Sequence, residues 1–220
     1  MEKEKKTTVG TFTQDPTKSI VKVQITRRIP DGVYVWIETD GFGHTFISIH
    51  KAKNIYVYSY GRYDDVDKIP ISGEGVLGNF KNDSAISFIR SELDAKNYKI
   101  YKINDVSLDK NITFFEDLWN NSNETPNNSN KKEIWKKYGK VISKYNLFYR
   151  NCTTVTIDSL KYAGTNIFNI ELKDSSDNIE YRYKIEGIIA PLELGNFMET
   201  RKTSSTNISD FTSQIKSYFN

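Results

Sequence analysis

Cys152 is the single cysteine of this 220-residue chain, and it directly follows Asn151. Asn is a good helix N-cap and apolar residues at helical spacing follow it, so Cys152 is predicted to lie at about the first position of a helix. Unpaired backbone amides and the helix dipole stabilise a thiolate there, and the same amides can receive an oxyanion. A lone cysteine is otherwise a small buried hydrophobic residue. Its position favours a nucleophile and leaves burial as the alternative.

A thiol nucleophile needs a base, and His44 and His50 are the only histidines. Both lie in one predicted strand, on the same face but about 20 Å apart at the rise of a strand. Only one of them can therefore serve a given site. His44 follows Gly41, Phe42 and Gly43, whose glycines leave room for a backbone or substrate to approach. We interpret His44 as the base and His50, beside a turn, as an ordinary polar residue of the strand.

A third group usually orients the imidazole of such a pair. A hairpin turn at residues 51–54 would place Ser59 diagonal to His44 on the same face of the sheet. A register shift of one residue would put Tyr58 or Tyr60 there instead. Ser59 is the predicted third member, and an ordinary polar strand residue is the alternative.

The elements that must position these residues are antiparallel strands followed by helices. Strands are predicted at residues 20–26, 33–39, 44–50, 54–60, 98–103 and 181–185. Helices are predicted at residues 84–93, 112–119, 132–145, 153–163 and 209–218, and long loops at 63–82 and 120–130. Gly164 is expected to end the helix that carries Cys152. We expect a flexible arm at 1–18 and a single catalytic domain at 19–220, with an α+β fold.

The bulk composition narrows the class of protein. Hydrophobic residues make up 37% and aromatic residues 13% of the chain, which indicates a packed core rather than disorder. A net charge of +3, with Lys interspersed among Asp and Glu, is no nucleic-acid signature, although it would tolerate an anionic cell wall or membrane. The apolar runs are too short for a transmembrane helix, and the charged start lacks the apolar region of a signal peptide. No Cys/His spacing predicts a metal site, and we expect no cofactor.

The order of three features resembles the permuted NlpC-type papain-like superfamily of cysteine peptidases and amidases. These features are Gly43-His44 at the start of a strand, a hairpin partner strand, and a much later Asn151-Cys152 at the start of a helix. In the permuted branch of this superfamily the His strand precedes the Cys helix, as it does here. The resemblance covers residues 33–62 and 145–164, with Val155 where the family often has Phe. In the lecithin:retinol-acyltransferase-like branch the third polar residue is a His, and Ser59 or a Tyr stands there in this chain.

This resemblance implies a permuted papain-like fold, with a β-meander or small barrel packed against the helix of Cys152. It implies catalysis by Cys152 and His44. The hairpin register adds Ser59 as the predicted third member, and the Cys152 amide and Asn151 are expected at the oxyanion. The expected reaction is cleavage of peptide or amide bonds of peptidoglycan by an antibacterial toxin. A type VI or contact-dependent secretion apparatus would deliver it to the target-cell periplasm, and an immunity protein would be its partner. A lipid acyltransferase or phospholipase of the same superfamily, and a non-enzymatic surface-binding module with a buried cysteine, are the alternatives.

Overall fold

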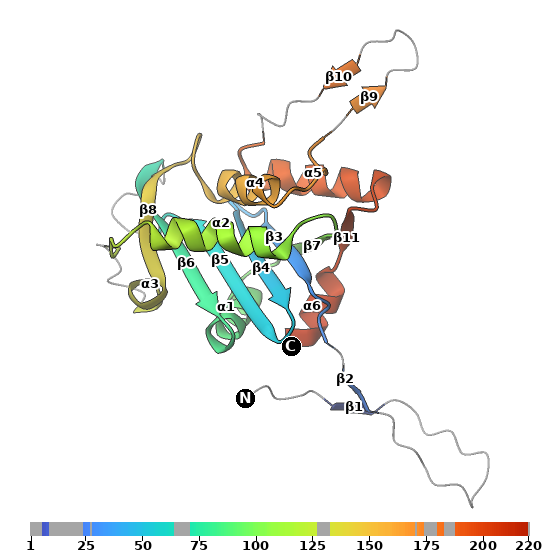
Figure 1. Cartoon of the computed structure of the whole chain (residues 1–220), viewed down its shortest axis with the longest axis horizontal. Coiled ribbons are helices and arrows are strands. Elements are labelled where there is room, and N and C mark those ends of the chain that lie inside the picture. The colour runs from blue at the N-terminus through green and yellow to red at the C-terminus, as the bar shows by residue number, and fades with distance from the viewer. Residues whose placement is uncertain are drawn as a thin grey trace, which may run out of the picture.

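The computed structural model describes residues 6–8, 24–26, 28–63, 71–126, 133–169, 171–173, 180–182 and 188–219. Its centre is a seven-stranded antiparallel sheet (Figure 1). In spatial order the sheet contains β11 (Ile208–Asp210), β7 (Lys99–Ile103), β3 (Gly32–Glu38), β4 (His44–Lys51), β5 (Asn54–Gly61), β6 (Ser72–Lys81) and β8 (Gly139–Asn146). The predicted α+β class and the meander, which runs from β3 to β6, are confirmed.

The sheet is open, so the predicted small barrel is wrong. A barrel requires its first and last strands to hydrogen-bond to each other. Here β11 and β8 lie at opposite ends of the strand order and are not paired with each other in the described residues.

Six helices of the described residues cover the two faces of the sheet. They are α1 (Asp83–Ala95), α2 (Leu108–Asn120), α3 (Glu133–Tyr138), α4 (Cys152–Tyr162), α5 (Pro191–Ser204) and α6 (Thr212–Phe219). Residues of α2, α4 and α5 belong to the hydrophobic cluster on one face, and residues of α1, α3 and α6 to the cluster on the other. Every residue of β3 is therefore buried, as expected for a strand covered on both sides.

The alternation of side chains along β4 assigns its residues to these two faces. Ile47 and Ile49 pack in the cluster that contains Val155 of α4. Phe46 packs on the opposite face, where its ring stacks on Trp36 with 4.9 Å between ring centroids. By the same alternation His44 is on the side of Phe46 and Thr45 is on the side of α4.

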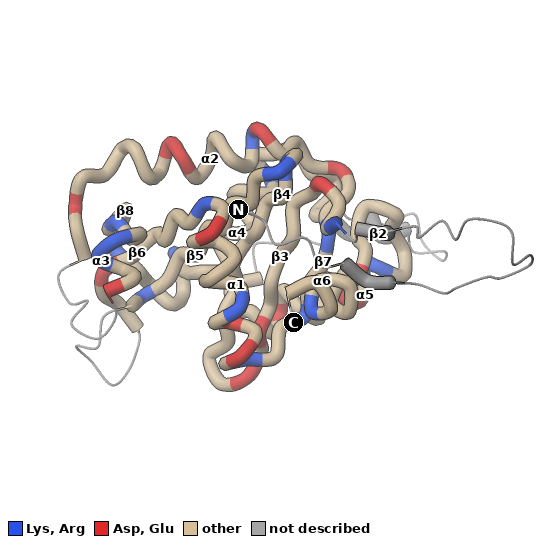
Figure 2. The backbone as a smooth tube through the Cα atoms, turned by 90° about the horizontal axis from the view of Figure 1, so that it is seen from below, with Lys and Arg blue, Asp and Glu red and all other residues tan. Residues whose placement is uncertain are grey.

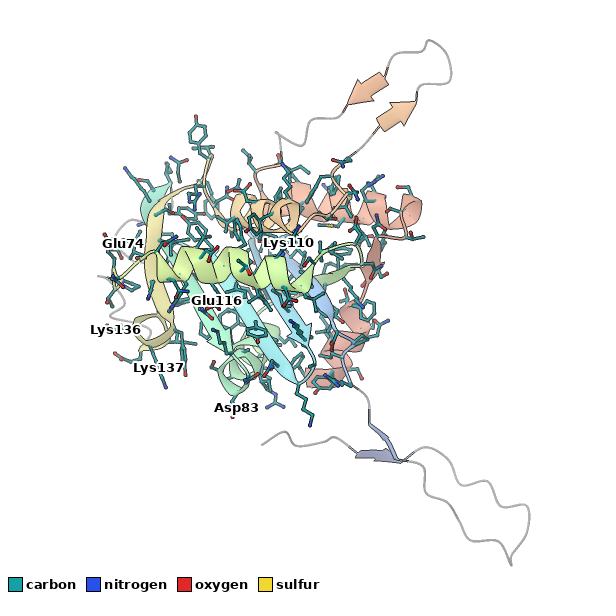
Figure 3. The ribbon with its side chains drawn as sticks, viewed as in Figure 1. Glu74, Asp83, Lys110, Glu116, Lys136 and Lys137 are labelled. Atoms are coloured by element: carbon teal, nitrogen blue, oxygen red, sulfur yellow. The ribbon has the colours of Figure 1, made fainter. Side chains whose placement is uncertain are left out.

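A carboxylate of α2 ties this helix to the strands beneath it. Glu116, labelled in Figure 3, accepts hydrogen bonds from the Tyr58 hydroxyl at 2.7 Å and from Asn79 Nδ2 at 3.1 Å. Lys81 Nζ lies 3.0 Å from the same carboxylate. These contacts hold α2 against β5 and β6, and lower the pKa of Glu116 in spite of its partial burial.

Two predicted elements are wrong, and both concern the far edge of the sheet. The helix predicted at 132–145 ends at Tyr138, and the chain continues as β8. The loop predicted at 63–82 contains β6, a ten-residue strand that pairs with both β5 and β8. Residues 64–70 lie outside the described part of the chain.

The glycines of β6 explain why this strand looked like a loop. A Cβ at Gly78 would lie 2.6 Å from the Trp135 ring, and one at Gly75 would lie 2.0 Å from the Tyr60 hydroxyl oxygen. Aromatic rings thus occupy the space of the missing side chains, and the strand is irregular between Gly75 and Val76. Glycines that signal a turn in a sequence serve close packing here.

The other predicted elements are confirmed in the described residues, with shifted ends. The helices predicted at 84–93, 112–119, 153–163 and 209–218 correspond to α1, α2, α4 and α6. Gly164 follows α4 with a φ of 92°, which suits its predicted role as the terminating residue. The sequence patterns missed α5, β11 and the short strands Lys6–Thr8 and Glu171–Lys173.

The arm predicted at 1–18 lies outside the described residues except for β1 (Lys6–Thr8), which pairs with β2 (Gln24–Thr26). The strand predicted at 181–185 is represented by β10 (Glu180–Arg182), which pairs with β9 (Glu171–Lys173). In the view of Figure 2, basic and acidic residues are interspersed along the described elements. Among the described helices, none has the length and apolar character that crossing a membrane requires.

Candidate active site

The start of β4 is held by a turn in which two glycines have positive φ, 64° at Gly41 and 67° at Gly43. A Cβ at Gly43 would lie 2.6 Å from the Glu38 carbonyl oxygen and 2.8 Å from Pro191 Cβ. No side chain fits at that position, so the turn packs directly on the beginning of α5. This close approach places His44, the next residue, at a defined point at the beginning of β4, the central strand of the sheet.

The strands β4 and β5 separate at the end where His44 lies. Their paired residues run from Lys51 and Asn54 at the hairpin to Ile47 and Tyr58, and no pairing continues beyond. Residues 59–61 of β5 are paired with β6 instead. The separation leaves the first residues of β4 available to another element, which is the N-terminus of α4: the Thr45 backbone lies near the Cys152 sulfur and acts to lower the pKa of its thiol.

Asn151 anchors the beginning of α4, as the sequence predicted. Its Oδ1 accepts hydrogen bonds from the amides of Thr153 at 2.9 Å and Thr154 at 3.0 Å. Its Nδ2 donates to the carbonyls of Leu147 at 2.6 Å and Ile189 at 2.8 Å. The side chain is 1% exposed and has no donor left for an oxyanion. Asn151 therefore positions Cys152 rather than contacting a substrate.

Cys152 lies at the first position of α4 and is 7% exposed. Burial raises the pKa of its thiol, and hydrogen bonds from the Thr45 backbone and from Thr153 oppose this rise only in part. The thiol is therefore protonated at neutral pH. The thiolate expected from the helix N-terminus alone is not the resting form, because desolvation outweighs the helix amides.

His44 and Ser59 are in direct contact, which confirms the predicted register over its alternatives with Tyr58 or Tyr60. His44 Nε2 lies 2.8 Å from Ser59 Oγ. The hydroxyl of Tyr63 completes a triangle, at 2.7 Å from Ser59 Oγ and 3.3 Å from His44 Nε2. These two hydroxyls engage one nitrogen of the imidazole and fix the ring orientation.

Tyr63 is a site residue that the sequence analysis missed. It begins the segment that is predicted as a loop, although it continues the two-residue period of Ser59 and Gly61 beyond the end of β5. Its ring stacks on Trp135 of α3, with 3.5 Å between ring centroids. Strand periodicity extended past Gly61 is the signal that would have found it.

The imidazole of His44 is neutral in the folded chain. Burial, and secondarily the positive charge of Lys96, lower its pKa to about 3. Glu38 is the cross-strand partner of His44 and is 4% exposed. Its Oε2 lies 3.5 Å from Lys96 Nζ, and its other oxygen accepts the Asp40 amide. No hydrogen bond joins the Cys152 sulfur to the His44 ring in the described residues, so the protonated thiol and the neutral imidazole are brought near each other only through Thr45, the residue after His44.

His50 is outside this site, as predicted. It is 4% exposed, and its Nε2 lies 3.4 Å from Ser48 Oγ, which also accepts a 2.9 Å hydrogen bond from Trp36 Nε1. Its ring packs edge-on against Tyr34 at 5.1 Å between centroids. His50 is a buried residue of the strand.

Large apolar side chains are exposed on the segments that hold the site. They are Phe42 (68% exposed), Phe148 (52%), Tyr149 (82%) and Leu192 (56%). Phe42 lies in the turn that packs on Pro191, and the segment 147–151 is tied to Ile189 through Asn151. We call these four residues the apolar rim. They lie on three segments near the start of α4, which are the turn before β4, the segment 147–151 and the beginning of α5.

No group of three or more His, Cys, Asp or Glu residues that could hold a metal occurs among the described residues. Comparison of the chain with protein-family models, with curated proteins and with solved structures finds no match.

Proposed function

We propose that this chain is a cysteine-dependent hydrolase of permuted papain-like fold, with Cys152 as nucleophile and His44 as base. The observation that carries the proposal is the packing of α4 on the face of β4, which brings the Cys152 sulfur beside the Thr45 backbone. It brings the thiol at a helix N-terminus next to the residue that follows the histidine. The triangle of His44, Ser59 and Tyr63 supplies the third group that such sites need.

The protonation states favour general-base catalysis over a preformed thiolate–imidazolium pair. The tautomer of His44 that donates from Nε2 to Ser59 Oγ leaves Nδ1 as a proton acceptor. For this reaction the imidazole, which lies on the Phe46 side of β4, must turn toward the sulfur at the strand end. Nδ1 then takes the thiol proton while the sulfur attacks the carbonyl carbon, and the carbonyl electrons move to the oxygen. The intermediate collapses, the leaving amine receives the proton from His44, and water activated by His44 then hydrolyses the thioester.

The substrate proposed is a peptide or amide bond of peptidoglycan, in keeping with the resemblance of the two motifs to peptidoglycan peptidases and amidases. Delivery by a type VI or contact-dependent secretion apparatus, action in the target-cell periplasm and an immunity partner belong to the same proposal. Basic and acidic residues are interspersed along the described elements (Figure 2), which suits a wall polymer better than a nucleic acid.

Incubation of the purified protein with muropeptides tests this function. New fragments should appear with the wild type and be absent with Cys152→Ala. Their rate should fall by about 10²- to 10⁴-fold with His44→Gln, because a general base contributes that much. His50→Gln is the matched control, since His50 lies outside the site, and it should keep the wild-type rate. Equal fragment release by Cys152→Ala would refute the proposal.

A lipid ester is the second candidate substrate, and the apolar rim favours it. Exposed Phe42 and Leu192 beside the site would suit acyl chains or a bilayer surface. Phospholipid vesicles incubated with the protein should then release fatty acid in a Cys152-dependent reaction. Replacing both rim residues by Ser should abolish this release without changing the cleavage of a small water-soluble ester.

The burial of Cys152 favours the non-enzymatic alternative, a surface-binding module with a structural cysteine. Iodoacetamide separates this alternative from an enzyme. A thiol that stays unmodified in the folded chain but reacts in urea would support a binding module and contradict both hydrolase proposals.

A further inference from the structure

Thr45 has a hydroxyl group without a partner in the interior of the protein. The residue is 0% exposed, and its Oγ1 makes no hydrogen bond in the part of the chain that is described. Leaving a buried hydroxyl unpaired is unfavourable, and the great majority of buried polar groups are paired. This unpaired group therefore indicates a ligand or a reaction intermediate that would use it.

The position of Thr45 indicates which intermediate this would be. Strand alternation directs its side chain to the face of α4, where Ile47 of the same strand packs with Val155. Its own backbone lies near enough to the Cys152 sulfur to act on the pKa of the thiol. The hydroxyl therefore lies on the side from which α4 presents the thiol.

The other unpaired atoms of the described residues differ from this one. Asn79 and Asn111 each lack a partner at Oδ1, but their side chains are otherwise bonded: Nδ2 of Asn79 donates to Glu116, and Nδ2 of Asn111 donates to the Ser159 carbonyl. Trp135 Nε1 is unpaired within an indole that stacks on Tyr63. Thr45 alone combines an unpaired hydroxyl with contact to the candidate nucleophile.

We propose that the Thr45 hydroxyl is a catalytic group of this site, which donates a hydrogen bond to the oxyanion that forms when Cys152 attacks a carbonyl. The inference rests on the proposed hydrolase function and names a residue for it. The backbone amide of Cys152, at the first position of α4, is the second donor. Asn151 cannot fill this role, because both of its donor hydrogens are bound to backbone carbonyls.

The chemistry separates an oxyanion donor from a group that acts on the thiol. Acylation by an ester passes through a tetrahedral intermediate: the C–S bond forms, the carbonyl electrons move to oxygen, and the alkoxide or phenoxide then leaves. Alkylation by iodoacetamide displaces iodide from carbon and forms no oxyanion. A residue that serves only the oxyanion therefore affects acylation and spares alkylation.

The probes are 4-nitrophenyl acetate for acetylation and iodoacetamide for alkylation, each followed at Cys152, the single thiol of the chain. Thr45→Val should slow acetylation by about 100-fold, the loss typical of one oxyanion donor. Its alkylation rate should equal that of the wild type. Thr45→Ser, which restores the hydroxyl, should acetylate within a few-fold of the wild-type rate. Thr113→Val, an exposed threonine of α2, controls for the substitution itself.

Acetylation of Thr45→Val at the wild-type rate would overturn the inference, and so would an equal loss of acetylation and alkylation. Thr45→Ala also lacks the hydroxyl and takes the place of Thr45→Val if that variant does not fold. A wild-type chain that is alkylated but never acetylated would defeat the proposed hydrolase function itself, and the inference with it. Normal acetylation in Thr45→Val defeats the inference alone.

Discussion

Asn151 is the residue whose removal should disturb both the stability and the site of this protein most clearly. Its side chain makes four hydrogen bonds, two that cap α4 and two that tie the Leu147 and Ile189 carbonyls to the helix start. Loss of an N-cap costs about 1 kcal/mol. Each of the other two bonds contributes about 1 kcal/mol, because both carbonyls are half-buried. Asn151→Ala should therefore lower the free energy of unfolding by about 3 kcal/mol.

Ser107→Ala is the matched control at another helix start. Ser107 caps α2 through a single 3.3 Å hydrogen bond from the Lys110 amide, so its replacement should cost about 0.5–1 kcal/mol. Urea unfolding followed by tryptophan fluorescence measures both losses. Asn151→Asp separates the two parts of the effect, because a carboxylate keeps the cap acceptor and loses both donors.

The Asn151 reasoning also predicts a change at the thiol. Without the cap the first turn of α4 should fray, and Cys152 should react faster with iodoacetamide than in Ser107→Ala. If Asn151→Ala loses no more stability than Ser107→Ala, the four hydrogen bonds do not act as described. An unchanged alkylation rate would show that the cap does not control access to the sulfur.

Three further outcomes follow from burial and packing. The alkylation rate of Cys152 should keep rising with pH beyond the range of an unstructured cysteine peptide, because burial raises its pKa; a plateau between about pH 6 and 8 would contradict this. His44 and His50 titrate near 6.5 when unfolded and about 3 when folded, so each should remove about 1.4 kcal/mol of stability per pH unit as the pH falls from about 6.5. His50→Gln should lessen this slope in acid unfolding, and an unaltered slope would argue against its burial as a neutral group. Gly78→Ala should lower the melting temperature, since its Cβ would lie 2.6 Å from the Trp135 ring. Gly195→Ala should raise it, because Gly195 is inside helix α5 and the new Cβ would be 3.5 Å from the nearest atom. Shifts of the same sign would refute this packing argument.

The acid sensitivity of His44 depends on the groups around it. Lys96 opposes its protonation, whereas Glu38 is its cross-strand neighbour and Ser59 and Tyr63 contact its ring. Because desolvation is the largest cause of the low pKa, salt should change the acid unfolding profile only slightly.

The sequence alone determined the features that depend on neighbouring residues. The role of Asn151 as a helix cap can be predicted from the sequence, because its side-chain oxygen is within local reach of the free backbone N–H two residues later. The contact between Ser59 and His44 follows from the hairpin register, since the side chains of a strand alternate with a period of two.

Tertiary structure decided the features that depend on what lies across the fold. Local propensity could not predict the strand β6, because the ring of Trp135 and the hydroxyl of Tyr60, which come from elsewhere in the chain, occupy the space above its glycines. The protonated state of Cys152 depends on burial, and burial is a property of the whole packed chain. The unpaired hydroxyl of Thr45 is likewise visible only once α4 lies against β4, because a single strand cannot show which polar groups remain without a partner.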